Sequence, residues 1–111
     1  MSITIREYLD PAGRSPYARW FDDLNAPAAA KVAIALYRLE FGNFSNVKNL
    51  GGGVYECKID FGPGYRIYFG KEGEHLIILL GGSSKKGQQA AIDAAKNAWA
   101  IHKRSGIRAV N

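Results

Sequence analysis

Two short segments of the chain alternate polar and apolar residues, and the polar set suits chemistry on a phosphodiester. A period of two is typical of β-strands, and the glycine-rich stretch 62–64 between segments 55–61 and 65–69 indicates a hairpin turn. If the apolar side chains face the helices, the polar ones emerge together on the other, open face of the sheet. Those polar residues are Glu56, Lys58, Asp60, Arg66 and Tyr68.

This polar set is compatible with cleavage of RNA without a metal. The 2′-hydroxyl of RNA is an internal nucleophile, so the protein needs only to orient it, move protons and stabilise charge on the phosphorus centre. Arg66 suits charge stabilisation because a guanidinium forks onto two phosphate oxygens. Lys58 or Glu56 could move the proton, and His102 is a candidate acid if its helix reaches the site. We expect no metal or other cofactor, since His75 and His102 are far apart in sequence and no carboxylates cluster.

The same residues also have a purely structural interpretation. With a hairpin loop of residues 62–64, Phe61 lies opposite Tyr65, Asp60 lies opposite Arg66, and Lys58 lies opposite Tyr68. A solvated sheet face with one such ion pair would contribute under ~1 kcal/mol, and losing Arg66 would then cost little stability. His102 is equally at home packed beside Trp99.

The charge of the chain favours a polyanionic partner. The formal net charge is +5. From Ser83 onward Asp93 is the lone acid, against Lys85, Lys86, Lys96, Lys103, Arg104 and Arg108. A basic field concentrated in this way is typical of nucleic-acid binding. We therefore expect Lys85, Lys86, Tyr68, Lys103 and Arg104 to contact RNA.

Hydrophobic periodicity predicts an α+β domain in the order β-α-α-β-β-β-α. An opening strand lies near residues 3–9, and two helices follow at 17–24 and from Pro27 to about 41 as a helical hairpin. The β-hairpin comes next, then a strand at 75–80 that is apolar on both faces and therefore central. A last helix spans about 87–104. We expect a mainly antiparallel four-stranded sheet with the helices grouped on one face.

Length and composition limit the classes of protein that the chain can be. With 111 residues and 47% hydrophobic residues, residues 1–111 should form a single folded domain. No run approaches the ~18 apolar residues of a membrane span, and the amino terminus lacks a signal-peptide pattern. Cys57 is the single cysteine, which excludes an internal disulfide and suggests a reducing, cytoplasmic setting. Its simplest role is that of a small buried side chain in a strand.

The block from Val54 to Phe69, with its Tyr65-Arg66-Ile67-Tyr68-Phe69 strand, resembles the RelE/ParE toxin superfamily, specifically its HigB-like addiction-module killer proteins. The likeness extends to Asn49-Leu50-Gly51, to Leu79-Leu80-Gly81-Gly82 and to the final helix with Trp99. It implies a toxin that cleaves messenger RNA on the ribosome, is neutralised by a cognate antitoxin in a hetero-oligomer, and has a compact sheet with helices on one side. By position, Arg66 matches the phosphate-binding arginine of the superfamily and Lys58 matches a basic position on the preceding strand.

The resemblance leaves other functions open. Near its carboxyl end this chain offers Lys85, Lys86 and His102, where many ribosome-dependent nucleases of the superfamily have a further arginine and a catalytic tyrosine or histidine. The ParE branch of the same fold inhibits DNA gyrase by protein contact and needs no such residues. A third interpretation is a basic RNA-associating domain without toxicity. A guanidinium of Arg66 lying beneath a helix, or aimed away from the neighbouring lysines, would rule out the cleavage mechanism predicted here.

Overall fold

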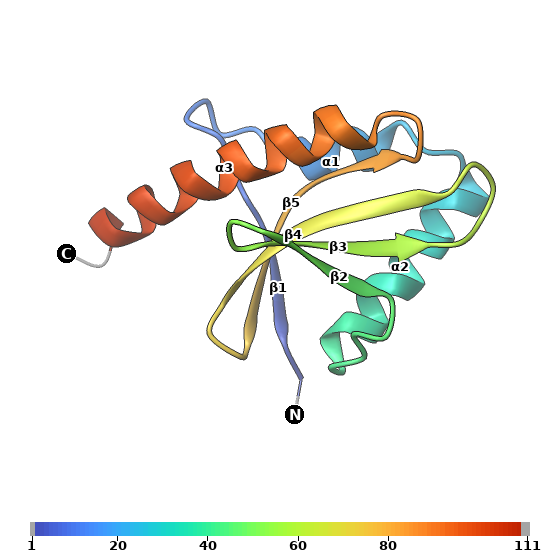
Figure 1. The fold of residues 1–111 in the computed structure, drawn as a ribbon, viewed down its shortest axis with the longest axis horizontal. Helices are drawn as coiled ribbons and strands as arrows, with labels where there is room; N and C mark the ends of the chain where they lie inside the picture. Colours follow the sequence, from blue (N-terminus) through green and yellow to red (C-terminus); the bar gives the residue numbers. More distant parts are fainter. Residues whose placement is uncertain (1, 110–111) are drawn as a thin grey trace.

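A computed structural model describes residues 2–109 and shows an α+β fold in three layers (Figure 1). In chain order the elements are β1 (Thr4–Glu7), α1 (Pro16–Asp22), α2 (Ala26–Glu40), β2 (Val47–Gly51), β3 (Val54–Ile59), β4 (Tyr65–Glu72), β5 (Leu76–Ser84) and α3 (Gln88–Ala109).

The sheet has five strands in the order β1-β5-β4-β3-β2, so the expected four-stranded, mainly antiparallel sheet is wrong. The sheet is mixed, because β1 pairs with β5 in parallel while the other pairs are antiparallel. The sequence of β2, Val-Lys-Asn-Leu-Gly, lacks the alternation of a typical strand and has one β-branched residue, Val47. It is a mostly exposed edge strand held by its pairing with β3, and such pairing is invisible in local sequence.

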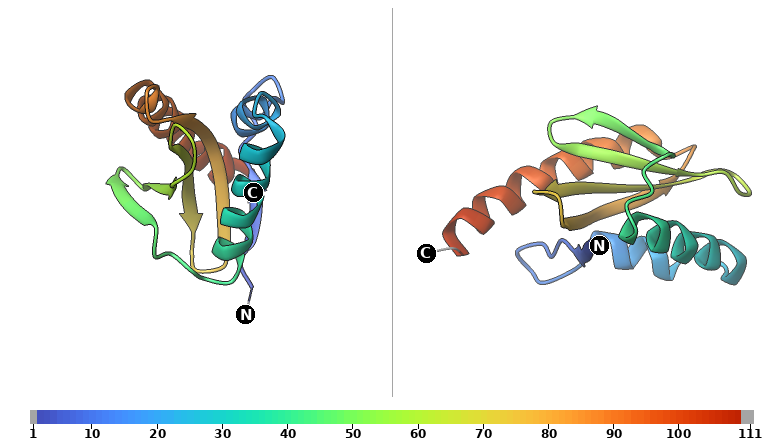
Figure 2. Two further views of the ribbon diagram at one scale, coloured as in Figure 1. Left: turned by 90° about the vertical axis from the view of Figure 1, so that its right-hand side faces the viewer. Right: turned by 90° about the horizontal axis from the view of Figure 1, so that it is seen from below.

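Helices cover both faces of the sheet, so their expected grouping on one face is also wrong (Figure 2). One core packs Tyr17 of α1 and Val32 and Leu39 of α2 against one face. A second core packs Ala95, Ala98 and Trp99 of α3 against the other. The expected central position of the strand near 75–80 is confirmed, since Ile77 and Leu79 of β5 enter the first core and Ile78 and Leu80 the second.

The two amino-terminal helices begin where their capping residues predict. The hydroxyl of Ser15 accepts a hydrogen bond from the Ala18 amide at 3.0 Å, and Pro16 occupies the first turn of α1. The side-chain oxygen of Asn25 accepts from the Ala28 amide at 2.9 Å and starts α2 in the same way. Gly42, with φ of 81°, follows the end of α2 and turns the chain toward β2.

The β3–β4 hairpin has a different register from the one predicted. Ile59, rather than Phe61, pairs with Tyr65, so residues 60–64 form the loop and Gly64 in it has φ of 79°. Arg66 therefore lies opposite Lys58 instead of Asp60, and Tyr68 lies opposite Glu56. The two registers differ by an even number of residues. Both keep the aromatic rings on the same face, which is why hydrophobic alternation could not distinguish them.

Candidate functional site

The predicted polar face of β3 and β4 lies against α3 and is largely buried, contrary to the open surface that we expected. Glu56 is 5% exposed, Arg66 is 7% exposed and Tyr68 is fully buried. The physical reason lies in α3, whose stripe of Ala95, Ala98 and Trp99 must be removed from water. Because α1 and α2 occupy the other face, α3 packs on this one and covers most of the polar row (Figure 2).

Arg66 and Glu56 form a buried ion pair beside the first turn of α3. The Arg66 Nε atom lies 3.5 Å from Glu56 Oε1, and the side-chain amide of Gln88 donates a 2.8 Å hydrogen bond to the same oxygen. The Nε and Nη1 atoms of Arg66 are both buried and neither makes an aligned hydrogen bond. A Cβ atom built on Gly64 would lie 3.6 Å from Nη1, which places that nitrogen against the hairpin loop. Arg66 therefore does not offer its guanidinium fork to a phosphate in solvent, and the predicted mechanism in which Arg66 binds the scissile phosphate is wrong for this conformation.

Tyr68 is held inside the same layer by a serine that the sequence did not single out as its partner. Its hydroxyl and the Ser83 Oγ atom are 2.9 Å apart. Burial raises the pKa of Tyr68, and the hydrogen bond with Ser83 opposes that rise. The expected contact of Tyr68 with RNA is therefore blocked in this conformation.

Three exposed lysines, Lys58, Lys85 and Lys86, lie around this buried pair, and we call them the lysine cluster. Lys58 on β3 pairs with Arg66 on β4, which in turn pairs with Ser83 on β5. Neighbouring strands are about 4.8 Å apart, so the backbones of Lys58 and Ser83 are separated by about 10 Å. The Lys85 amide donates to the Gly64 carbonyl at 2.8 Å and ties the β5–α3 turn to the hairpin loop. The cluster thus forms at one end of the sheet.

His102 lies far from the lysine cluster, so the four predicted catalytic residues are not brought together. Its Nε2 atom contacts Glu72 Oε1, and its ring stacks on Trp99 at 5.4 Å and meets Tyr8 edge-on at 6.3 Å. Glu72 ends the β4 strand in which Arg66 is near the start, a separation of about 20 Å. Lys103 and Arg104 are exposed beside His102 in α3 and share this distance from the cluster.

Gln88 is the site residue that sequence reasoning missed. It is the first residue of α3, and its role depends on how that helix packs over β3, so no local pattern could have revealed it.

Comparison with known proteins places the chain in a family without assigning a function. No family model matches it. It is 41% identical over 97 residues to an uncharacterized protein from Haemophilus influenzae (strain ATCC 51907 / DSM 11121 / KW20 / Rd), a match that covers 86% of this chain and 92% of that protein. The chain belongs to the family of that protein. Because the match covers most of both chains, the two are relatives over nearly the whole fold.

Within residues 2–109 the structure has neither a metal-binding group of side chains nor a membrane-spanning helix. No group of three or more His, Cys, Asp and Glu side chains is placed to hold a metal ion. Neither α3 nor the shorter helices combine the length and the apolar character needed to cross a bilayer.

Cys57 is buried in β3, as expected, and burial raises the pKa of its thiol to about 11. The thiol is therefore protonated and unreactive near neutral pH.

Proposed function

We propose that this chain is a cytoplasmic toxin of a type II toxin–antitoxin pair, of the RelE/ParE kind, that cleaves messenger RNA on the ribosome. The observation that carries the proposal is the lysine cluster. Lys58, Lys85 and Lys86 are solvent-exposed and come from two parts of the chain to one end of the sheet, and Lys58 lies within the block that resembles the toxin superfamily. Clustered exposed lysines favour binding to a phosphate backbone.

The proposed reaction uses the substrate's own nucleophile. The 2′-oxygen attacks the adjacent phosphorus while its proton passes to water, and the bond to the 5′-oxygen breaks as that oxygen takes a proton from the Lys58 ammonium. The products are a 2′,3′-cyclic phosphate and a 5′-hydroxyl. The cluster lysines hold the phosphate and stabilise its added negative charge, and Lys58 is the exposed group nearest along the sheet to Arg66. Arg66 acts as a positioning residue, since its buried pairing with Glu56 fixes the strand that Lys58 flanks.

A cognate antitoxin is part of this proposal. A toxin with an exposed basic cluster requires a partner to suppress it, and acidic side chains that cover Lys58, Lys85 and Lys86 would compete directly with RNA. The two proteins would form a hetero-oligomer, and the gene beside that of the toxin is the first place to seek the antitoxin.

A second candidate function is inhibition of DNA gyrase by protein contact. The observation in its favour is the dispersal of the predicted proton-transfer groups, since Glu56 is buried and His102 pairs with Glu72 at the other end of β4. A protein-binding inhibitor needs no such groups, whereas a nuclease does.

The test is controlled expression of the chain in bacteria without its neighbouring gene, followed by mapping of transcript ends. We expect growth arrest with cuts in phase with codons. The triple variant Lys58→Ala, Lys85→Ala, Lys86→Ala should lose both effects at least about tenfold while staying folded, because exposed lysines contribute little stability. Arg14→Ala, an exposed cation in the β1–α1 loop, is the matched control and should stay toxic.

Other outcomes separate the candidates. Growth arrest with DNA-damage signalling and intact transcripts would favour the gyrase inhibitor. Unimpaired growth with the wild-type chain would contradict both toxins and leave an RNA-associating domain.

A further inference from the structure

The outward face of α2 is apolar, although it faces away from the sheet. The buried side of this helix carries Ala28, Val32 and Leu39. The opposite side, which we call the outer stripe, consists of exposed residues at helical spacings of three, one, three and four: Ala30, Ala33, Ile34, Tyr37 and Phe41. A surface helix ordinarily shows charged and polar residues on that side. A helix with apolar residues on two opposite sides is typically buried on both sides by other protein.

The large members of the outer stripe are exposed to solvent. Ile34 is 46% exposed, Tyr37 is 63% exposed and Phe41 is 61% exposed, and the rings of Tyr37 and Phe41 lie 4.9 Å apart. Among the described residues, Leu9 is the other large hydrophobic side chain with comparable exposure. Single exposed apolar residues are common on proteins, but a contiguous group along one helix marks an interaction surface.

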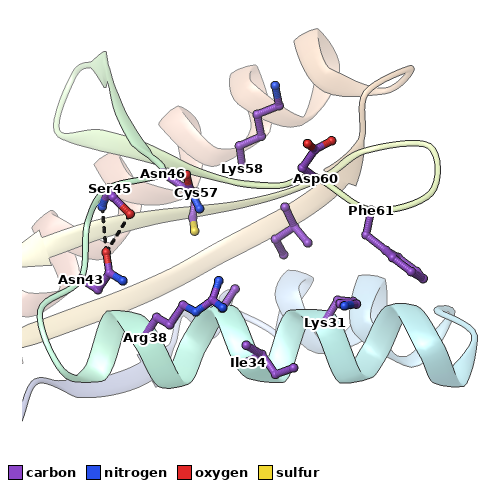
Figure 3. A pocket seen from close by; sticks show the side chains of 12 residues that line it. Lys31, Ile34, Arg38, Asn43, Ser45, Asn46, Cys57, Lys58, Asp60 and Phe61 are labelled. Carbon is purple, nitrogen blue, oxygen red and sulfur yellow. Dashed lines mark hydrogen bonds between the residues drawn. The ribbon is translucent and has the colours of Figure 1, made fainter.

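One flank of the outer stripe is basic. Lys31 and Arg38 are exposed on α2 and point toward a cavity of about 230 Å³ between this helix and the end of β3 (Figure 3). Lys58 of β3 is a third cation in the lining, Asp60 is its acidic member, and the remaining polar side chains are uncharged, from Asn43, Ser45 and Asn46. The nitrogen of Lys31 also lies 5.3 Å from the ring centre of Phe61. The surface thus combines an apolar stripe with two cations beside it.

We propose that the outer stripe binds an amphipathic helix of a partner protein, with acidic side chains placed over Lys31 and Arg38. The spacing of the stripe matches the ridge that one helix presents to another, and α2 is about 22 Å long, enough for four turns of contact. The acidic character follows from charge complementarity with the basic flank. This inference does not rest on the proposed function, because the outer stripe belongs to α2, whereas Lys85 and Lys86 lie in the turn before α3. Lys58 is the member of the lysine cluster that also lines the cavity beside α2.

A second copy of this chain fits the surface less well. A symmetric dimer buries the same patch on both subunits, so each subunit would bring Lys31 and Arg38 to the interface. Glu40 is the acidic residue that α2 offers against them, so positive charges would outnumber negative ones at that interface. RNA is the competing occupant, since bases stack on aromatic rings such as those of Tyr37 and Phe41. The aliphatic part of the stripe favours a helix instead, because Ile34 and the alanines offer a nucleotide neither hydrogen bonds nor charge.

The test measures binding of the full chain to a synthetic helical peptide of about 18 residues, with leucines every three or four residues and glutamates along one flank. The companion peptide has lysines in place of the glutamates. We expect the acidic peptide to bind at least about tenfold more tightly, by fluorescence anisotropy. The double variant Tyr37→Ser, Phe41→Ser and the variant Arg38→Glu should each weaken its binding by about tenfold or more, whereas Leu9→Ser, the matched control, should leave it unchanged.

Several results would overturn the proposal. These are failure of the acidic peptide to bind, equal binding of both peptides, or binding that survives Tyr37→Ser, Phe41→Ser. If the free chain is a dimer in light scattering and this double variant is a monomer, the occupant is a second copy. If a single-stranded RNA oligonucleotide displaces the peptide and the double variant loses RNA binding, the occupant is RNA. All substituted side chains are exposed, and circular dichroism will verify that each variant folds.

Discussion

At the scale of single residues, the pairing of Arg66 with Glu56 is the feature with the largest energetic consequence. Both side chains are less than a tenth exposed, and two nitrogens of Arg66 lack aligned acceptors. Removing two charges from water is costly, so the pair adds little net stability compared with apolar residues of similar size. Loss of one partner is different, because it leaves the other as a buried, uncompensated charge.

We therefore predict that Glu56→Gln destabilises the protein by about 3–5 kcal/mol, since Arg66 would keep its charge without a counterion. Arg66→Met should destabilise it by a similar amount, whereas the double variant should cost clearly less than the sum of the two. Urea unfolding of the wild type and the three variants measures this coupling. Additive effects would show that the two side chains do not interact.

This prediction reverses the expectation drawn from the sequence, in which a solvated Arg66 would cost under ~1 kcal/mol to remove. The alternation of β3 and β4 was enough to place Glu56, Lys58, Arg66 and Tyr68 on one face, and the structure confirms this. It could not show that α3 covers that face, because burial depends on which helix packs where. The start of α3 likewise determines why Lys58 is exposed while its neighbour Arg66 is buried, because the first turn of the helix covers Arg66 and does not cover Lys58.

At the scale of elements, two tryptophans dock helices onto glycines of the central strands. Trp20 of α1 lies over Gly82 of β5, and a Cβ atom built on that glycine would be 2.2 Å from the indole ring. Trp99 of α3 lies over Gly70 of β4, where the corresponding distance is 2.4 Å. Neither glycine has a left-handed backbone, so close helix approach, rather than conformation, requires the missing side chain.

We predict that Gly70→Ala and Gly82→Ala each destabilise the protein by about 1–3 kcal/mol, because the added methyl group overpacks the contact with an indole ring. Thermal unfolding followed by tryptophan fluorescence measures both effects. Gly87→Ala is the matched control, since its Cβ atom would make an ordinary 3.9 Å contact with Ser83. It should change stability by less than about 0.5 kcal/mol. Equal effects at all three positions would contradict this account of docking.

The helices were the most predictable elements, because the signals that start them are local. Ser15 and Asn25 cap α1 and α2, and the apolar stripe around Trp99 identified α3. Strand β2 was missed since its polar residues are held by pairing with β3 alone. The parallel pairing of β1 with β5 joins residues about 70 positions apart, and such a contact leaves no local pattern.

At the scale of the whole molecule, burial in the core makes the free energy of unfolding depend on pH, because two buried side chains, the Cys57 thiol and the Tyr17 hydroxyl, lose protons at high pH. Burial raises the pKa of Cys57 from its ordinary 9.0 to about 11, an effect that the nearby charge of Arg38 opposes. Burial also raises the pKa of Tyr17 from 10.0 to about 12. Above pH 9 the unfolded chain releases the Cys57 proton while the folded protein still holds it. The free energy of unfolding must therefore fall as pH rises from 9 to 11, and Tyr17 extends the fall toward pH 12.

Replacing Cys57 with alanine tests this linkage. We predict that Cys57→Ala lowers stability near pH 8, because the sulfur leaves a small void beside α2, but that the variant loses less stability than the wild type on going to pH 11. The difference in free energy of unfolding between the two proteins should shrink by about 2–3 kcal/mol over this interval, since a rise of two pH units in a pKa corresponds to that energy. Denaturant unfolding at fixed pH steps measures both curves. Parallel curves would show that the thiol keeps an ordinary pKa in the folded protein.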